Sequence, residues 1–325
     1  MVELRRSFQT LLWLLRRNES DIINCYNFIT PYVMRVIGSS MLNFGYWNSK
    51  ITNLVEAQHE LCMLVGKFAE MDSAKSVLDI GSGFSEPAIH WKSVYSNLDI
   101  TCLDINLLQL KNTTGLVRID RDSSNALDLT HQALSFYNHD VATDISLLNG
   151  TAKVLPFKDE CMDRVIALES AQHFKSLVQF IDESRRILRP DGLFVIAIPV
   201  TTMTKTSISK IRDLLRLGIL SWTWRSEHYE LEYVKLLLSG LGFDIIDIQH
   251  IGSHVYEHLA SYYIQNRTII KNIILQERTK TTFYHNILYE VIERVVYISA
   301  LKMKEAFQKG FIDYVLIKAK LDQLQ

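Results

Sequence analysis

The stretch from residue 76 to residue 92, SVLDIGSGFSEPAIHWK, constrains the fold of this chain more than any other. An apolar run over 77–80 leads into a Gly-Ser-Gly turn, and helix-compatible residues resume at Pro87. Proline suits the first turn of a helix because its missing N–H has no partner there anyway. The pattern predicts a strand, a tight turn and a helix, with bare glycine backbone that a nucleotide can approach.

Two carboxylates narrow the choice of nucleotide. Asp79 stands just before the turn, and Glu86 occupies the place of the third glycine of a dinucleotide-binding motif. Both charges would repel a pyrophosphate at the helix N-terminus. A ligand with a cationic centre and no phosphate fits better, and S-adenosylmethionine, with its sulfonium and ammonium groups, has this chemistry. The alternative is a plain strand-to-helix turn in some other α/β domain.

Composition limits the class of protein. The chain has 325 residues, 48% of them hydrophobic, which is ample for a core, and a net charge of −1, which gives no global basic field to attract nucleic acid. Its four cysteines lie far apart without a C-x-x-C pair, which indicates free thiols in a reducing compartment. No run is long enough to span a bilayer, so we expect a soluble, cytoplasmic protein.

Residues 1–17 are predicted to form a short amphipathic helix with arginines at both ends. Arg16 and Arg17 close its apolar run after a few residues, and no small-residue cleavage site follows, which argues against a signal peptide. Such a helix packs on its own domain or on a second copy in a homodimer. Its basic flanks also suit peripheral contact with an anionic membrane surface, without stable insertion.

Apolar strands alternate with helices along most of the chain, which predicts an α/β fold with a doubly wound, mostly parallel, seven-stranded sheet covered on both faces. The second strand ends at Asp104, about 20 residues beyond the glycines, where nucleotide-binding folds bind a ribose diol; a helix N-cap is the alternative. The expected strands cover 77–80, 98–104, 144–150, 164–168, 193–198, 243–248 and 311–318.

The remaining segments are expected to surround the substrate. We divide the chain into N-terminal helices with an aromatic loop over 1–70, a nucleotide-binding core over 71–199, and a helical lid with closing strands over 200–325. Helical material is predicted over 258–309. His250, His254 and His258 recur every four residues and would lie on one helix face. We expect no metal there, because no carboxylate or thiolate converges on them; pocket, proton-transfer and plain polar-face roles stay open.

These motifs together resemble the class I S-adenosylmethionine-dependent methyltransferases. VLDIGSG at 77–83 resembles the first motif of that family, and GTAKVLPF at 150–157 and LRPDG at 188–192 resemble motifs around strands four and five. GYW at 45–47, ESAQHF at 169–174 and GFIDYV at 310–315 look like the branch that acts on small molecules such as sterols, tocopherols, quinones and macrolide sugars. The resemblance covers residues 43–325 and implies a Rossmann-like methyltransferase fold with an added helical lid.

The resemblance also implies site residues. His173 is the expected base, with a helix-capping or core histidine as the alternative, and Glu169 is the second catalytic candidate, more suited to the methionine end of the cofactor. Substrate contacts are expected from Trp222, His228, Tyr229 and His254. The residues expected to bind the cofactor are Tyr46, Trp47, Asp79, Gly81, Ser82, Gly83, Asp104, Ile105, Gln109, Thr151, Ala152, Glu169 and Ser170.

Two positions depart from the family pattern. Thr151 replaces the acid that contacts adenine, so adenine recognition must depend more on backbone groups or on the threonine hydroxyl. Ser85 and Glu86 replace the usual glycines after Gly83. These departures leave a second class open, a protein that keeps the fold but only binds or scaffolds, and measured affinity for S-adenosylmethionine separates the two.

Methyl transfer requires alignment of donor and acceptor and exclusion of water more than it requires many catalytic side chains. A hydroxyl acceptor needs a nearby base, an amine needs desolvation, and an alkene needs an aromatic or carboxylate pocket. The aromatic and aliphatic residues over 200–310 favour a lipophilic small-molecule acceptor. Nucleic acid is disfavoured as a partner, because the chain lacks a base-flipping motif and a basic stripe.

Overall fold

A computed structural model describes residues 18–37, 39–113, 145–202, 229–277 and 283–322. Seven strands form one sheet with the order β3-β2-β1-β4-β5-β7-β6. All neighbouring pairs are parallel except those of β7, which runs antiparallel to both β5 and β6. This confirms the predicted fold class. The strands are β1 Ser76–Ile80, β2 Asp99–Asp104, β3 Ile145–Asn149, β4 Met162–Leu168, β5 Leu188–Thr201, β6 Phe243–His250 and β7 Ile312–Leu321.

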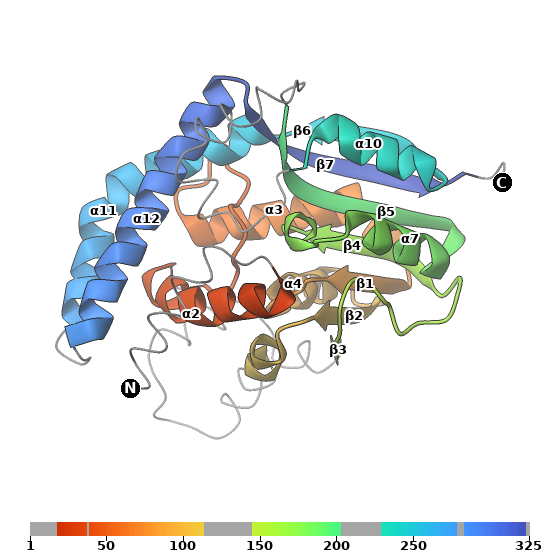
Figure 1. Cartoon of the computed structure of the whole chain (residues 1–325), viewed down its shortest axis with the longest axis horizontal. Coiled ribbons are helices and arrows are strands. Elements are labelled where there is room, and N and C mark those ends of the chain that lie inside the picture. The colour runs from red at the N-terminus through yellow and green to blue at the C-terminus, as the bar shows by residue number, and fades with distance from the viewer. Residues whose placement is uncertain (1–17, 38, 114–144, 203–228, 278–282, 323–325) are drawn as a thin grey trace.

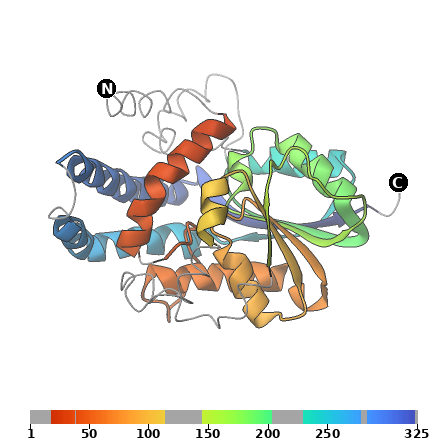
Figure 2. The same ribbon diagram turned by 90° about the horizontal axis from the view of Figure 1, so that it is seen from below.

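The central strands are apolar on both sides because both faces of the sheet are covered (Figure 2). Val77 of β1 faces the core shared with the helices α3 (Leu54–Phe68) and α4 (Glu86–Val94). Leu78 and Ile80 face the opposite core, which the helices α7 (Leu177–Ile187) and α10 (Leu231–Gly240) complete. The alternation of side chains along a strand therefore divides β1 between two hydrophobic layers.

Three longer helices lie beyond the carboxyl ends of the parallel strands (Figure 1). Helix α2 (Glu19–Ile37) crosses this edge, and α11 (His258–Glu277) and α12 (Phe283–Gln308) form an antiparallel pair next to it. In open α/β sheets this edge is where ligands bind. The predicted division into 1–70, 71–199 and 200–325 stays a prediction.

The expectation for the three histidines was wrong. His250 ends β6, His254 lies in a single π-helical turn over Ser253–Glu257, and His258 begins α11. They do not share one helix face, because the strand continues to His250. The Nδ1 atom of that residue lies 2.6 Å from a carboxylate oxygen of Asp313 on β7.

One smaller expectation also changed. Residues 189–192, whose Arg-Pro-Asp-Gly sequence predicts a turn, lie within β5 at an irregularity where its register with β4 shifts. The helical material predicted over 258–309 consists of two helices, α11 and α12. Among the described helices, none combines the length and the apolar character needed to cross a membrane.

Candidate active site

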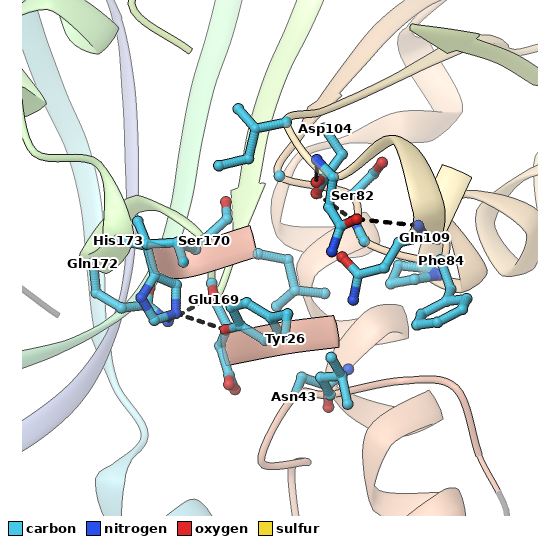
Figure 3. A pocket seen from close by; sticks show the side chains of 18 of the residues that line it. Tyr26, Asn43, Ser82, Phe84, Asp104, Gln109, Glu169, Ser170, Gln172 and His173 are labelled. Atoms are coloured by element: carbon cyan, nitrogen blue, oxygen red, sulfur yellow. Dashed lines mark hydrogen bonds between the residues drawn. The ribbon is translucent and has the colours of Figure 1, made fainter. Parts of the chain in front are cut away.

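A cavity of about 260 Å³ lies between α2 and the carboxyl ends of β1, β2 and β4 (Figure 3). Six parts of the chain meet there: α2, the loop before α3, the glycine turn after β1, and the three segments that follow β2, β3 and β4. Its lining residues are Glu19, Ile22, Ile23, Tyr26, Ser40 to Phe44, Gly81 to Phe84, Glu86, Pro87, Asp104 to Asn106, Gln109, Ala152, Lys153, Leu168 to Ser170, Gln172 to Phe174, and Pro199.

The two glycines of the turn after β1 are required for different reasons. Gly81 has φ +72°, and a Cβ there would lie 2.3 Å from the Cβ of Ser170, so a side chain is excluded by the protein itself. Gly83 has φ +58°, but its nearest neighbour to an added Cβ is Oε1 of Gln109 at 4.0 Å. Gly83 therefore leaves open a part of the cavity wall that a ligand can approach.

Asp104 joins the end of β2 to this turn. One carboxylate oxygen accepts the Gly83 N–H at 2.8 Å, and the other accepts the Asn106 N–H at 2.7 Å. Burial raises the pKa of Asp104, and the two backbone hydrogen bonds oppose that shift. Each carboxylate oxygen can accept a further hydrogen bond, so Asp104 can also hold a ribose diol at the cavity wall.

Asp79 lies behind the cavity wall and is not among the lining residues. It is 2% exposed, and its Oδ2 atom has no hydrogen-bond partner within the described structure. Burial and the nearby charge of Asp104 raise the pKa of Asp79 to about 7. An orphaned buried carboxylate of this kind is destabilising unless something positive compensates it.

Glu86 and Ser85 have local structural roles in place of the family glycines. Ser85 adopts φ +55°, a conformation that glycine reaches more easily, and is fully buried. The Glu86 carboxylate accepts a hydrogen bond from the Ser40 hydroxyl, and further bonds from Ser39 and from the backbone at Ser40 and Met41. These hydrogen bonds of Glu86 connect the loop before α3 to the first turn of α4.

Glu169 follows β4 with the strained φ of +51°, which is uncommon for a residue other than glycine. Its Oε1 accepts the Phe44 N–H and the Tyr314 hydroxyl, each at 2.9 Å. Burial raises the pKa of Glu169 to about 8, against the lowering effect of these two bonds. The loop before α3 and β7 together hold this carboxyl group at the cavity.

His173 contacts α2 directly at the cavity wall. The hydroxyl of Tyr26 lies 2.7 Å from Nε2 of His173, and the two rings meet edge to face with centroids 5.5 Å apart (Figure 3). Burial, with smaller effects from Cys25, Glu169 and Asp104, raises the pKa of Tyr26 well above its usual range. The phenol therefore keeps its proton and is a hydrogen-bond donor at neutral pH.

The structure brings ten of the predicted site residues together on the cavity wall. Thr151 is adjacent to it through a hydrogen bond to Glu19. Trp222 and His228 lie outside the described residues, and the Tyr229 hydroxyl donates to the carbonyl oxygen of Phe174. The ten lining residues are Gly81, Ser82, Gly83, Asp104, Ile105, Gln109, Ala152, Glu169, Ser170 and His173.

Three predicted residues form a separate cluster. His254 stacks on Tyr46 with ring centroids 4.7 Å apart, and its Nδ1 lies 2.9 Å from the carbonyl oxygen of Trp47. The Trp47 N–H in turn donates to the carbonyl oxygen of His254 at 2.8 Å. These contacts fix the aromatic loop to the turn before α11, and none of the three residues lines the cavity.

Sequence reasoning missed the contribution of α2. Glu19, Tyr26 and Thr30 all reach toward site residues, and their spacing of seven and four places them on one helix face. Asn27 accepts a hydrogen bond from the Asn106 side chain at 2.8 Å. A polar stripe at helical spacing was therefore the signal that could have located this wall of the site.

Comparison with known proteins agrees with this geometry. Residues 78–196 match the family model described as a methyltransferase domain. Erythromycin 3''-O-methyltransferase of Saccharopolyspora erythraea is 26% identical over 229 residues, which are 69% of this chain and 68% of that protein. Methyltransferase GfsG of Streptomyces halstedii is 28% identical over 67% of this chain and 71% of its own length.

Among solved structures, the [4+2]-cyclase SpnF aligns with a TM-score of 0.66 and 17% identity, over 94% of this chain and 96% of its own. That likeness shows the fold alone. These matches relate the chain to the class I S-adenosylmethionine-dependent methyltransferases, with the methyltransferase domain over residues 78–196. Within that class it is related to the methyltransferases of small molecules.

The cavity fits S-adenosylmethionine by the chemistry of its wall. Asp104, Glu169 and Glu19 supply carboxylates, which suit a ligand with cationic groups and a ribose diol. The orphaned Oδ2 of Asp79 is a further acceptor behind the glycine turn. Lys153 is the one lysine or arginine among the described lining residues, and it is paired with Glu19 at 3.0 Å. Such a wall disfavours a phosphate.

Proposed function

We propose that this methyltransferase acts on a hydroxyl group of an uncharged, lipophilic small molecule, and that Tyr26 and His173 take up the proton of that hydroxyl. The observation that carries the proposal is the 2.7 Å contact between the Tyr26 hydroxyl and Nε2 of His173 in the cavity wall. When bound, S-adenosylmethionine supplies a methyl group already activated by its sulfonium centre.

The surroundings of this pair support a lipophilic acceptor. Apolar side chains from α2, the loop before α3, the end of β4, the segment after it and β5 line the same cavity. An acceptor with a carboxylate or phosphate would find no unpaired lysine or arginine among the described lining residues, since Lys153 is bound to Glu19. The apolar residues are Ile22, Ile23, Met41, Leu42, Phe44, Leu168, Phe174 and Pro199.

Proton transfer follows from the donor and acceptor roles of the pair. The protonated Tyr26 phenol donates a hydrogen bond to Nε2 of neutral His173. The phenol oxygen can therefore accept a proton from the acceptor hydroxyl as the oxygen of that hydroxyl forms its bond to the methyl carbon. The acceptor's proton moves to Tyr26, the Tyr26 proton moves to His173, and His173 ends as imidazolium. The sequence predicted His173 as the base; in this proposal Tyr26 and His173 share that function.

Glu169 has a different role in this proposal. Its carboxyl group is held by Phe44 and Tyr314 rather than by the Tyr26–His173 pair. With a pKa of about 8, it is mostly protonated at neutral pH and is a poor general base there unless a cation binds beside it. We assign Glu169 to the ammonium end of the cofactor, together with Asp79, while Asp104 holds the ribose.

The relatives' names include oxygen, nitrogen and carbon as targets, and the 3''-O-methyltransferase of erythromycin is the relative whose name supports oxygen here. The test is transfer of radiolabelled methyl groups by the full chain to four probes: a neutral macrolide glycoside, a sterol, sarcosine and phosphoethanolamine. We expect label on the neutral hydroxyl compounds. Label on sarcosine or phosphoethanolamine with none on either neutral compound would contradict the proposal.

A further inference from the structure

The loop after β3 lies directly beside Asp104. Asp104 pairs with Asn149 in the parallel register of β2 and β3, and the Asp104 carbonyl oxygen accepts both the Gly150 N–H at 3.1 Å and the Asn149 side-chain amide at 2.9 Å. Thr151 follows at once. If Asp104 holds the ribose, the cofactor can extend from there in two directions along the cavity. The direction toward β1 and β4 leads to the glycine turn and Glu169, where the methionine end binds, so the adenine extends toward the loop after β3.

Glu19 of α2 places a carboxylate at this same loop. Its Oε1 accepts the Thr151 hydroxyl at 2.8 Å and lies 3.0 Å from Nζ of Lys153. The Glu19 side chain is 38% exposed and lines the cavity. Burial acts to raise the pKa of Glu19, but the hydrogen bonds and charge of Thr151 and Lys153 outweigh it, and the pKa is lowered. Glu19 is therefore an anion at neutral pH.

Thr151 alone is a weak acceptor for a ligand. It has a single hydroxyl proton, which it gives to Glu19, and its oxygen also accepts the Lys153 backbone N–H at 3.3 Å. One lone pair remains. Both contacts of Glu19 are made by Oε1, and within the described residues Oε2 keeps its lone pairs for a ligand. The stronger acceptor at this position thus comes from α2.

We infer that Glu19 recognises the 6-amino group of adenine, with Thr151 and Lys153 as the residues that position it. The inference depends on the cofactor of the family and on no particular acceptor. The 6-amino group is a hydrogen-bond donor, which matches a carboxylate. A base with a 6-oxo group presents an acceptor at the same place and is repelled.

Calorimetry of the full chain with S-adenosyl-L-homocysteine and with S-inosyl-L-homocysteine tests the inference without any acceptor. We expect the wild type to prefer the adenine compound by about 10- to 100-fold, the range for hydrogen bonds to charged groups. Glu19→Gln should reduce that preference to about threefold or less, because an amide can rotate to donate or accept.

Asp21→Asn is the matched control. Asp21 lies two residues further along α2, accepts the Asn18 backbone N–H at 3.1 Å and does not line the cavity. It should keep the wild-type preference. A wild type without preference, a Glu19→Gln variant that keeps it, or an equal loss in Asp21→Asn would each overturn the inference. A wild type that binds neither compound would instead contradict the assigned cofactor, so the two failures are distinct.

Discussion

The hydroxyl of Tyr26 and Nε2 of His173 lie 2.7 Å apart, although 147 positions separate the two residues in the chain. The contact connects α2, near the N-terminus, to the segment after β4. Both groups that our proposal uses for proton transfer line the cavity. Glu19, on the same face of α2, also lines it and contacts Thr151 in the loop after β3.

Tyr26→Phe should therefore lower turnover more than cofactor binding. Removing the hydroxyl interrupts the path from the acceptor to His173, and the loss expected for a general-base contribution is about 100-fold in kcat. Affinity for S-adenosylhomocysteine, measured by calorimetry, should change by about threefold or less, because the phenyl ring still covers the cavity. Tyr233→Phe, at an exposed site stacked on Tyr229, is the control and should behave as wild type. Unchanged kcat in Tyr26→Phe would refute the proton path.

Asp79 should make the ligand-free protein less stable as the pH rises. Its folded pKa of about 7 exceeds its ordinary value of 3.8, so between about pH 4 and pH 7 the folded state binds more protons than the unfolded state. The free energy of unfolding therefore falls as the pH increases through this window, by on the order of 2–4 kcal/mol from this residue.

Asp79→Asn removes that dependence. Denaturant unfolding at pH 8 should show the variant more stable than wild type by on the order of 2 kcal/mol, while its affinity for the cationic cofactor falls. A variant that is less stable than wild type at pH 8, or that binds S-adenosylmethionine as well as wild type, would show that this carboxylate is not the uncompensated charge we describe.

Tyr314→Phe should shift a titration that belongs to Glu169. Burial raises the pKa of Glu169 to about 8, and the Tyr314 hydroxyl counters that effect. Without the hydroxyl the pKa should rise further, so the pH at which S-adenosylmethionine affinity reaches its plateau should move upward. Calorimetry between pH 6 and pH 9 measures this, with Tyr233→Phe again as control. The prediction fails if the two affinity profiles coincide.

Replacing the two glycines of the turn by alanine should have different effects on stability and on cofactor binding. Gly81→Ala places a Cβ 2.3 Å from Ser170 at a positive φ, so it should lower the free energy of unfolding by about 2 kcal/mol or more. Gly83→Ala meets no protein atom closer than 4.0 Å, but its methyl group enters the cavity wall, so its larger effect should be on cofactor affinity.

Gly240→Ala is the matched control for both glycines. It ends α10 with nothing within 4 Å of the added Cβ, and it should be neutral for stability and for binding. Thermal unfolding and calorimetry on the three variants check the pattern. Equal effects of Gly81→Ala and Gly83→Ala on both quantities would contradict the separate roles we assign to the two glycines.

The sheet and much of the cavity wall could be predicted from the sequence for a clear physical reason. Strands buried on both faces are apolar throughout, and parallel strands end at one edge, so Gly83, Asp104 and Glu169 had to lie near one another. The position of α2 could not be predicted in the same way. Which surface a helix covers depends on packing between distant segments, and Tyr26 carries no motif that indicates His173 as its partner.

The contacts of the aromatic loop and of the histidines could not be predicted from the sequence either. Tyr46 and Trp47 belong to a motif of the small-molecule branch, yet their contacts with His254 fix a loop to the turn before α11. The four-residue spacing of the histidines favoured one helix, but β6 continues to His250 and the helical segment begins only at Gly252. A Cβ at Gly252 would lie 2.4 Å from Asp313 Oδ1, because the chain turns closely against β7 there.

The most direct test of the account is the affinity of the full chain for S-adenosylhomocysteine, compared with that of Asp104→Asn. Asp104 is the carboxylate that joins the glycine turn to the cavity wall, and an amide in its place can no longer accept hydrogen bonds at both positions. We predict one molecule bound per chain by the wild type and binding weakened by about tenfold or more in the variant. No binding by the wild type, or equal binding by both proteins, would contradict the central claim that this cavity holds the methyl donor.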